Sequence, residues 1–81
     1  MELGTKIIGD FGGYGPLWNG EVANLSYRGR RVIVNKDFPP DMVKVEWDDG
    51  DYTWLDASEI NAAVGKLSPI GYYTEEAYYA R

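Results

Sequence analysis

The sequence contains no cysteine and no histidine among its 81 residues. Without cysteine, neither a disulfide nor a thiolate zinc site is available to stabilise the fold. Without histidine, the commonest metal ligand and the commonest general base at neutral pH are both missing. A chain this short forms one small domain and buries only about 60–65% of the surface that its unfolded form exposes. We therefore expect a modest core built from aromatic and β-branched side chains.

Long apolar runs and positive charge are also scarce. No stretch approaches the ~20 apolar residues that span a bilayer, so no membrane association is expected. The opening residues, MELGTKII, lack the basic and apolar regions of a secretion signal, which leads us to expect a cytoplasmic location. Eight basic and thirteen acidic residues give a net charge of −5. Because such a surface repels phosphate backbones, we expect a basic protein partner rather than nucleic acid.

Glycine and aromatic residues, in contrast, are abundant. Residues 9–20, GDFGGYGPLWNG, hold five glycines and one proline together with four large apolar side chains. This composition suits neither a helix nor a strand and predicts a long ordered loop pinned by its aromatic rings. Its glycine spacing does not match a phosphate-binding fingerprint. Short strands are predicted near this loop, at residues 6–8 and 30–35.

The most informative stretch is VKVEWDDGDYTWLDASEI, residues 43–60. MVKVEW alternates cleanly, which predicts a strand with its valines and Trp47 on one face. Asp49 and Gly50 then predict a tight two-residue turn. That turn places Trp47 opposite Tyr52 and brings Trp54 onto the same face, so that three rings lie together. A four-residue loop, residues 48–51, keeps the same pairing.

Helix-capping signals follow this hairpin. Asp56 and Glu59 have the spacing of a capping box, which predicts a single helical turn at residues 57–61. Residues 62–67 are expected to form a last short strand. In the tyrosine-rich end, Thr74 is expected to cap one further helical turn. We therefore expect a barrel at residues 1–71 and a tail at residues 72–81.

The order of these elements resembles the SH3-like barrels of the Tudor, Agenet and KOW type. Those families often carry a V-x-W/F-x-D-G hairpin followed by an extended strand and a polar turn, and the matching residues here are Val45, Trp47, Asp49, Gly50 and Ile60. The resemblance implies an all-β fold, a small SH3-like (Tudor-like) barrel of about five strands with one short helical turn. Small barrels of this kind are also common among phage-encoded accessory proteins.

The resemblance also implies a binding site, because Tudor-like barrels build an aromatic cage from the first long loop and the tight hairpin. The corresponding residues here are Tyr14, Trp18, Trp47, Tyr52 and Trp54, with Asp48, Asp49 and Asp51 as an acidic rim. Carboxylates beside such rings favour a cationic guest. Two simpler interpretations remain open: the rings form only a core, and the acids serve only the turn. The aspartates lack the alternating spacing of a calcium loop, so neither a metal nor another cofactor is expected.

These observations favour a non-enzymatic module that binds a basic protein partner. The hydroxyl groups present have no histidine to activate them, and nothing singles out a catalytic carboxylate pair. One alternative is a small acidic inhibitor, of the type that phages direct against host defence, which blocks a nucleic-acid-binding protein. A second is a KOW-like nucleic-acid-binding module that uses the local basic cluster of Arg28, Arg30 and Arg31. No oligomeric state follows from the sequence.

Overall fold

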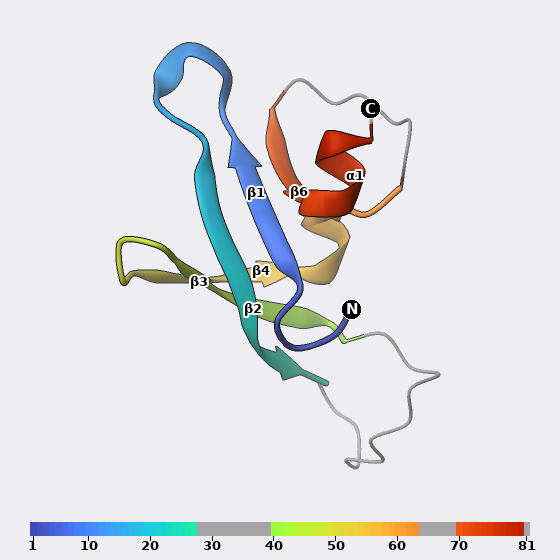
Figure 1. The fold of residues 1–81 in the computed structure, drawn as a ribbon. Coiled ribbons are helices and arrows are strands. Elements are labelled where there is room, and N and C mark those ends of the chain that lie inside the picture. Colours follow the sequence, from blue (N-terminus) through green and yellow to red (C-terminus); the bar gives the residue numbers. More distant parts are fainter. Residues whose placement is uncertain (28–39, 64–69, 81) are drawn as a thin grey trace.

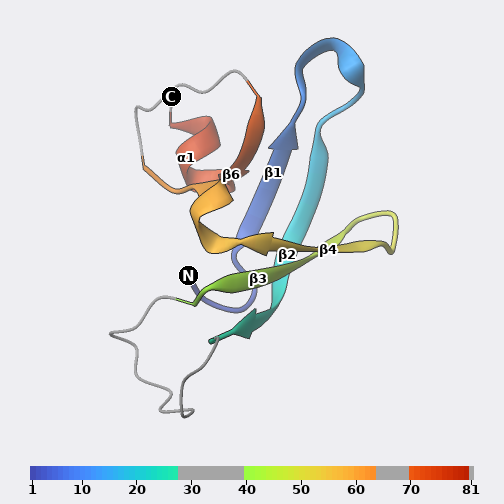
Figure 2. The ribbon, with the colours of Figure 1, turned by 180° about the vertical axis from the view of Figure 1, so that it is seen from behind.

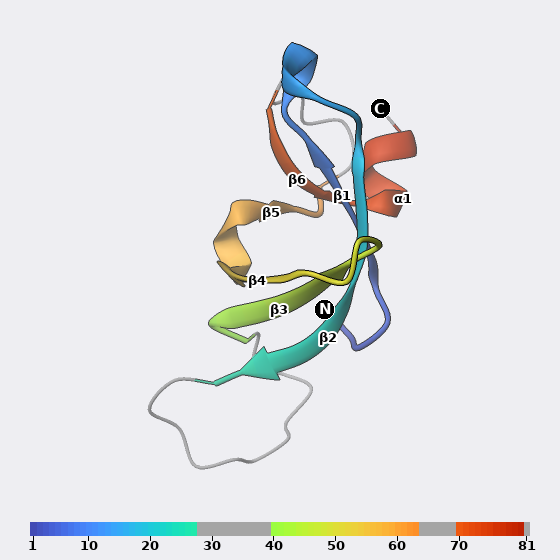
Figure 3. The ribbon, with the colours of Figure 1, turned by 90° about the vertical axis from the view of Figure 1, so that its left-hand side faces the viewer.

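The computed structural model describes residues 1–27, 40–63 and 70–80, and in these ranges the chain forms one six-stranded sheet in the order β4-β3-β2-β1-β6-β5. The strands are β1 (Lys6–Asp10), β2 (Trp18–Ser26), β3 (Met42–Trp47), β4 (Tyr52–Asp56), β5 (Ile60–Asn61) and β6 (Gly71–Thr74). Neighbouring strands are antiparallel except β5 and β6, which are parallel. The sheet curls into a half-barrel, as Figures 1 and 3 show, which confirms the predicted small all-β class.

The glycine-rich segment is more regular than the sequence suggested. β1 extends to Asp10 and β2 begins at Trp18, so the connection is only residues 11–17, with a 3-10 turn, η1 (Gly12–Tyr14), inside it. Asp10 Oδ1 accepts a hydrogen bond from the Gly12 backbone N–H at 3.0 Å and helps to fix the start of this connection. The predicted long loop is therefore partly a pair of strands. The strand predicted at residues 30–35 lies outside the described residues.

The hairpin between β3 and β4 has a different register from the predicted one. Glu46 pairs with Tyr52 and Val45 with Thr53, so every pair is shifted by one residue. The connection is the three-residue loop 48–50, in which the Gly50 N–H donates to the Trp47 carbonyl at 3.0 Å and Gly50 has φ +92°. This geometry is that of a type I turn followed by a left-handed glycine. The predicted pairing of Trp47 with Tyr52 was wrong.

A one-residue shift reverses the faces of a strand. Trp47 points to the concave face with the valines of β3, whereas Tyr52 and Trp54 point to the convex face beside Lys44. Thr53 takes the position opposite Val45 that the predicted register gave to Trp54, and Leu55, opposite Val43, is buried at 5% exposure. The three rings of the hairpin therefore do not share a face.

After β4 the chain forms a second 3-10 turn, η2 (Ala57–Glu59), which Figure 2 shows leading into β5. This turn is where a helical turn was expected, but the Asp56 side chain makes no capping hydrogen bond. Within residues 62–67, where the last strand was predicted, Ala62 and Ala63 are not in a strand and the others lie outside the described residues.

The tyrosine-rich end contributes both a strand and the only α-helix in the described ranges. β6 pairs with β1, so the boundary expected at residue 71 coincides with the first residue of a strand in the same sheet. Helix α1 (Glu75–Tyr79) follows directly, and Thr74 Oγ1 accepts a hydrogen bond from the Ala77 N–H at 3.2 Å, as its predicted capping role requires. Tyr78 donates from its hydroxyl to Asp10 Oδ2 at 2.7 Å, which fastens the helix to β1.

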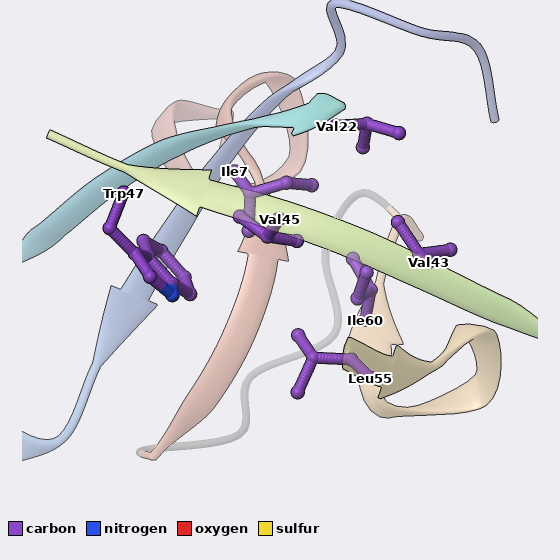
Figure 4. Packing of buried hydrophobic residues seen from close by; sticks show 7 residues of the cluster. All are labelled: Ile7, Val22, Val43, Val45, Trp47, Leu55 and Ile60. Carbon is purple, nitrogen blue, oxygen red and sulfur yellow. The ribbon is translucent and has the colours of Figure 1, made fainter. Parts of the chain in front are cut away.

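Two apolar clusters hold the sheet, one on each face. The concave cluster, shown in Figure 4, consists of Ile7, Val22, Val43, Val45, Trp47, Leu55 and Ile60. The convex cluster consists of Ile8, Tyr73 and Tyr78, and α1 contributes the last of these. Alternation along β1 explains the division, because Ile7 and Ile8 point to opposite faces. In the described ranges, no helix has the length and apolar character needed to cross a membrane.

Candidate aromatic binding site

Gly9 forms the floor of a group of aromatic rings on the concave face. It lies directly between Trp18 of β2 and Tyr72 of β6 in the sheet register. A Cβ atom on Gly9 would lie 3.2 Å from Trp18 Cβ and 3.3 Å from the Phe11 ring. Because glycine has no side chain, these rings close in over the strand, and Phe11 meets Tyr72 edge-on with ring centroids 5.3 Å apart.

Gly20 has the same role for the fourth ring, that of Trp47. A Cβ atom on Gly20 would lie 2.6 Å from the Glu46 carbonyl oxygen and 2.7 Å from the Trp47 ring. The indole can therefore cross β2 only because this residue is glycine. Trp47 Nε1 donates to Thr53 Oγ1 at 3.1 Å, which fixes the orientation of the ring. The ring is only 6% exposed.

Trp18 completes the arrangement and is far more exposed. Its ring meets Trp47 edge-on with centroids 6.0 Å apart, yet 43% of the residue remains accessible. Trp47 in turn lies 5.8 Å from Tyr72 at a shallow angle of 31°. The four rings thus form a continuous series from Phe11 through Tyr72 and Trp47 to Trp18. Trp18 is the member of the series with the most surface available to a partner.

These rings line an open pocket of about 360 Å³, which we call the aromatic pocket; its lining residues are Phe11, Trp18, Trp47, Thr53 and Tyr72. A smaller pocket of about 220 Å³, the tip pocket, adjoins it at the two tryptophans; its lining residues are Pro16, Leu17, Trp18, Asn19, Trp47, Asp48 and Asp49. The aromatic pocket has the volume of a small ligand site and suits one or two side chains of a protein partner.

Carboxylates lie beside both pockets. Asp48 and Asp49 are exposed in the wall of the tip pocket. At the other end, burial raises the pKa of the Tyr72 phenol, and the negative charge of nearby Glu59 raises that pKa further. Burial, the larger cause, disfavours any charge at this hydroxyl, whereas the smaller effect, the negative charge of Glu59, favours a cation nearby. In the described part of the chain, no group of three or more acidic side chains is arranged to hold a metal ion.

The structure brings together only part of the set of residues predicted from the sequence. Trp18, Trp47, Asp48 and Asp49 line the two adjoining pockets. Asp51 is exposed behind the turn, where its N–H donates to Asp49 Oδ1 at 3.0 Å. Tyr14 ends η1, and its side chain is not among those described. Arg28, Arg30 and Arg31 lie outside the described residues.

Tyr52 and Trp54 form a separate patch on the convex face. They are 59% and 41% exposed. The Lys44 ammonium lies 4.3 Å from the centroid of the Tyr52 ring, a cation–π contact within this protein. This patch and the aromatic pocket lie on opposite sides of the same hairpin. The charge that contacts this patch is that of Lys44, whereas Asp48 and Asp49 adjoin the two pockets.

Sequence reasoning did not predict two walls of the aromatic pocket, Phe11 and Tyr72. Phe11 was assigned to a loop and Tyr72 to a tail, and neither assignment suggests that the two rings meet. The local signal that could have revealed β6 is composition, because the Tyr-Tyr-Thr run of residues 72–74 consists of residues that favour strands.

The chain was also compared with known proteins. No family model, curated protein or solved structure matches it. The functional interpretation therefore depends on the pockets and on the charges around them.

Proposed function

We propose that this chain is a non-enzymatic protein-binding module that takes side chains of a basic partner segment into the aromatic pocket. The observation that carries the proposal is the position of Trp18, which is 43% exposed and packs edge-on against buried Trp47 at the aromatic pocket. An exposed tryptophan held by a rigid neighbour has the character of a binding hot spot, since it buries a large area with little loss of conformational freedom.

Charge determines the kind of partner that suits this site. The protein has a net charge of −5, and Asp48 and Asp49 lie at one end of the paired pockets while Glu59 lies near the other. A lysine or arginine side chain can lay its apolar stem against the rings and direct its charge toward these carboxylates. The same acids raise the rate of encounter with a basic surface. An acidic segment would be repelled at both ends.

A second candidate function is competition with nucleic acid for a basic protein, as an inhibitor of the phage anti-defence type would do. The observation that favours it is a hollow of about 400 Å³ on the convex side, whose lining includes Glu21, Glu46, Asp48 and Glu75. Carboxylates spaced in this way present negative charge to a basic groove, as a phosphate backbone does. Among the described residues that line this hollow, Lys6 is the one basic residue, and it forms an ion pair with Glu21 at 3.2 Å. Displacement of DNA from a basic protein, without any binding of DNA by the chain itself, distinguishes this function from a KOW-like one.

The test of the proposed function uses two ten-residue peptides, one alternating arginine with valine and one alternating glutamate with valine. The arginine–valine peptide should bind, and the glutamate–valine peptide should not. Trp18→Ala should weaken binding about 30-fold, the effect of losing a hot spot worth about 2 kcal/mol. Tyr79→Ala is the matched control, since it removes a ring that is 65% exposed on α1. Calorimetric titration measures affinity, and thermal melting confirms that each variant is folded.

Full affinity in a folded Trp18→Ala variant would show that the aromatic pocket is not the site. Equal binding of the two peptides would show that charge does not select the partner.

A further inference from the structure

Within the described residues, the outer edge of β4 is open. β4 is the last strand of the sheet on its side, and no strand in the described ranges pairs with its outer edge. The opposite edge of the sheet is β5, which has only two residues. β4 has five residues and contains neither proline nor lysine, the residues that commonly protect such edges.

The hydrogen bonds to β3 show which backbone groups of β4 face outward. The backbone carbonyl of Asp51 accepts from the Trp47 N–H at 2.8 Å, and the Ala57 N–H donates to the Asp41 carbonyl at 2.9 Å. Backbone groups alternate in direction along an antiparallel strand, so the odd-numbered residues of β4 face β3. The backbone N–H and C=O groups of Tyr52, Trp54 and Asp56 therefore face away from the sheet.

We propose that the basic partner segment binds as an added β-strand along this outer edge of β4. The inference rests on the proposed function and specifies how the segment is presented. Thr53 belongs to β4 and also lines the aromatic pocket. Side chains of an added strand alternate between the faces, so those on the concave face lie beside Thr53 and the aromatic pocket. Those on the other face lie beside Tyr52 and Trp54.

The charges at the two ends of β4 favour a basic segment over a second copy of this chain. Two copies paired antiparallel about Trp54 would place the acidic tip of each, with Asp49 and Asp51, beside Asp56 and Glu59 of the other. Like charges at both ends oppose that pairing. A segment that carries arginine or lysine instead meets opposite charge at each end. On the convex face the Lys44 ammonium already lies 4.3 Å from the Tyr52 ring centroid, so this contact is satisfied within the chain.

Amide hydrogen exchange, measured by NMR with and without the arginine–valine peptide, tests this inference residue by residue. The outward N–H groups of Tyr52, Trp54 and Asp56 should exchange freely without the peptide and at least tenfold more slowly at saturation. The N–H groups of Thr53 and Leu55, which already bond to β3, should change little. Binding through side chains alone would leave the outward amides exchanging freely and would overturn the inference.

A pair of variants provides an independent measurement. Trp54→Pro removes an outward N–H, whereas Trp54→Thr removes the same ring and keeps the N–H. Proline is tolerated at such an edge position because no bond to the neighbouring strand is lost. The proline variant should bind the peptide about five- to tenfold more weakly than the threonine variant. Equal affinities of the two folded variants would count against an added strand.

Failure of this inference can be distinguished from failure of the proposed function. Suppose that Trp18→Ala weakens peptide binding but the peptide does not protect the outward amides of β4. This result would support the aromatic pocket as the site and exclude the added strand. The opposite result is that the peptide protects those amides while Trp18→Ala keeps full affinity. It would support the added strand and exclude the aromatic pocket. No binding of the peptide at all would exclude both. A peptide N-methylated at every backbone nitrogen keeps the arginine side chains and loses its backbone N–H donors, so the added strand requires that it bind at least tenfold more weakly.

Discussion

Trp47 and Trp54 belong to the same hairpin but have opposite environments. Trp47 is 6% exposed, contacts two other rings and donates a hydrogen bond to Thr53, whereas Trp54 is 41% exposed on the other face. The two residues have the same side chain, so hydrophobicity does not explain the difference. The three-residue loop 48–50 sets the register, and the register assigns each tryptophan to a face. As a result, the concave face of the hairpin carries the core and the aromatic pocket, and its convex face carries the exposed patch of Tyr52 and Trp54.

The largest expected effect is on the free energy of unfolding, when Trp47 and Trp54 are each replaced by alanine. Trp47→Ala should destabilise the fold by about 3–5 kcal/mol, because it leaves a cavity in the concave cluster. Trp54→Ala should cost less than about 1 kcal/mol, as expected for an exposed position. Urea unfolding of the two variants measures the difference in the free energy of unfolding. Similar losses in both would mean that the two faces are not distinct as described.

The second effect compares the two glycines beneath the rings. Gly20→Ala should destabilise by about 1–3 kcal/mol, because the new methyl group meets the rigid Glu46 carbonyl at 2.6 Å. Gly9→Ala meets only side-chain atoms at 3.2 Å or more, so its cost should be smaller. The Gly9 variant should instead weaken peptide binding, since it raises the floor of the aromatic pocket. Unfolding curves and titrations of both variants check the contrast, and an opposite order of stability would refute it.

The third effect tests the loop that determines the two faces. Gly50→Val should destabilise by about 1–2 kcal/mol, because a β-branched residue is strained at φ +92°. Gly13→Val is the control, since Gly13 has no positive φ and a Cβ there meets no atom within 4 Å. Thermal melting of both variants measures the difference. An unchanged melting temperature for Gly50→Val would mean that the left-handed turn does not hold the register.

The smallest effect concerns the Tyr72 phenol in the aromatic pocket. Burial, assisted by the charge of Glu59, raises its pKa in the folded state above the ordinary value of 10.0. The folded protein then holds this proton more tightly than the unfolded chain does, so stability decreases as pH rises above about 10. Tyr72→Phe should make that decrease shallower. Urea unfolding across this alkaline range gives the comparison, and an unchanged slope for Tyr72→Phe would contradict it.

The strand at MVKVEW was predictable because its alternation is uninterrupted and one face is fully apolar. The turn at Asp49 and Gly50 was located correctly, but its length was not. Asp-Gly fits both a two-residue turn and a type I turn that ends in a left-handed glycine. The predicted register favoured burying Trp54, whereas the structure buries Leu55, which fits beside the other aliphatic side chains. Local sequence does not distinguish these outcomes, because the choice depends on the volume that remains in the concave cluster.

The aromatic pocket was only half predictable for a related reason. Trp18 and Trp47 stood out as large rings near glycine and a turn. Phe11 and Tyr72 are 61 positions apart in the sequence and meet only because β1 pairs with β6. A long-range pairing of this kind leaves no periodicity that links its two partners. Gly9, which provides the space between them, is indistinguishable in sequence from the loop glycines that follow it.

The pairing of β1 with β6 also determines when a growing chain can finish folding. β1 lies between β2 and β6, so it gains its second neighbour only after the ribosome has added residues 71–74. The bond between Tyr78 and Asp10, which joins residues 68 positions apart, forms later still. Until then Ile8 has neither β6 nor α1 to cover it, and β1 presents an unpaired edge. Contacts this distant in sequence slow folding, so the nascent chain stays vulnerable to proteases and to association with other chains until nearly all of these residues have emerged.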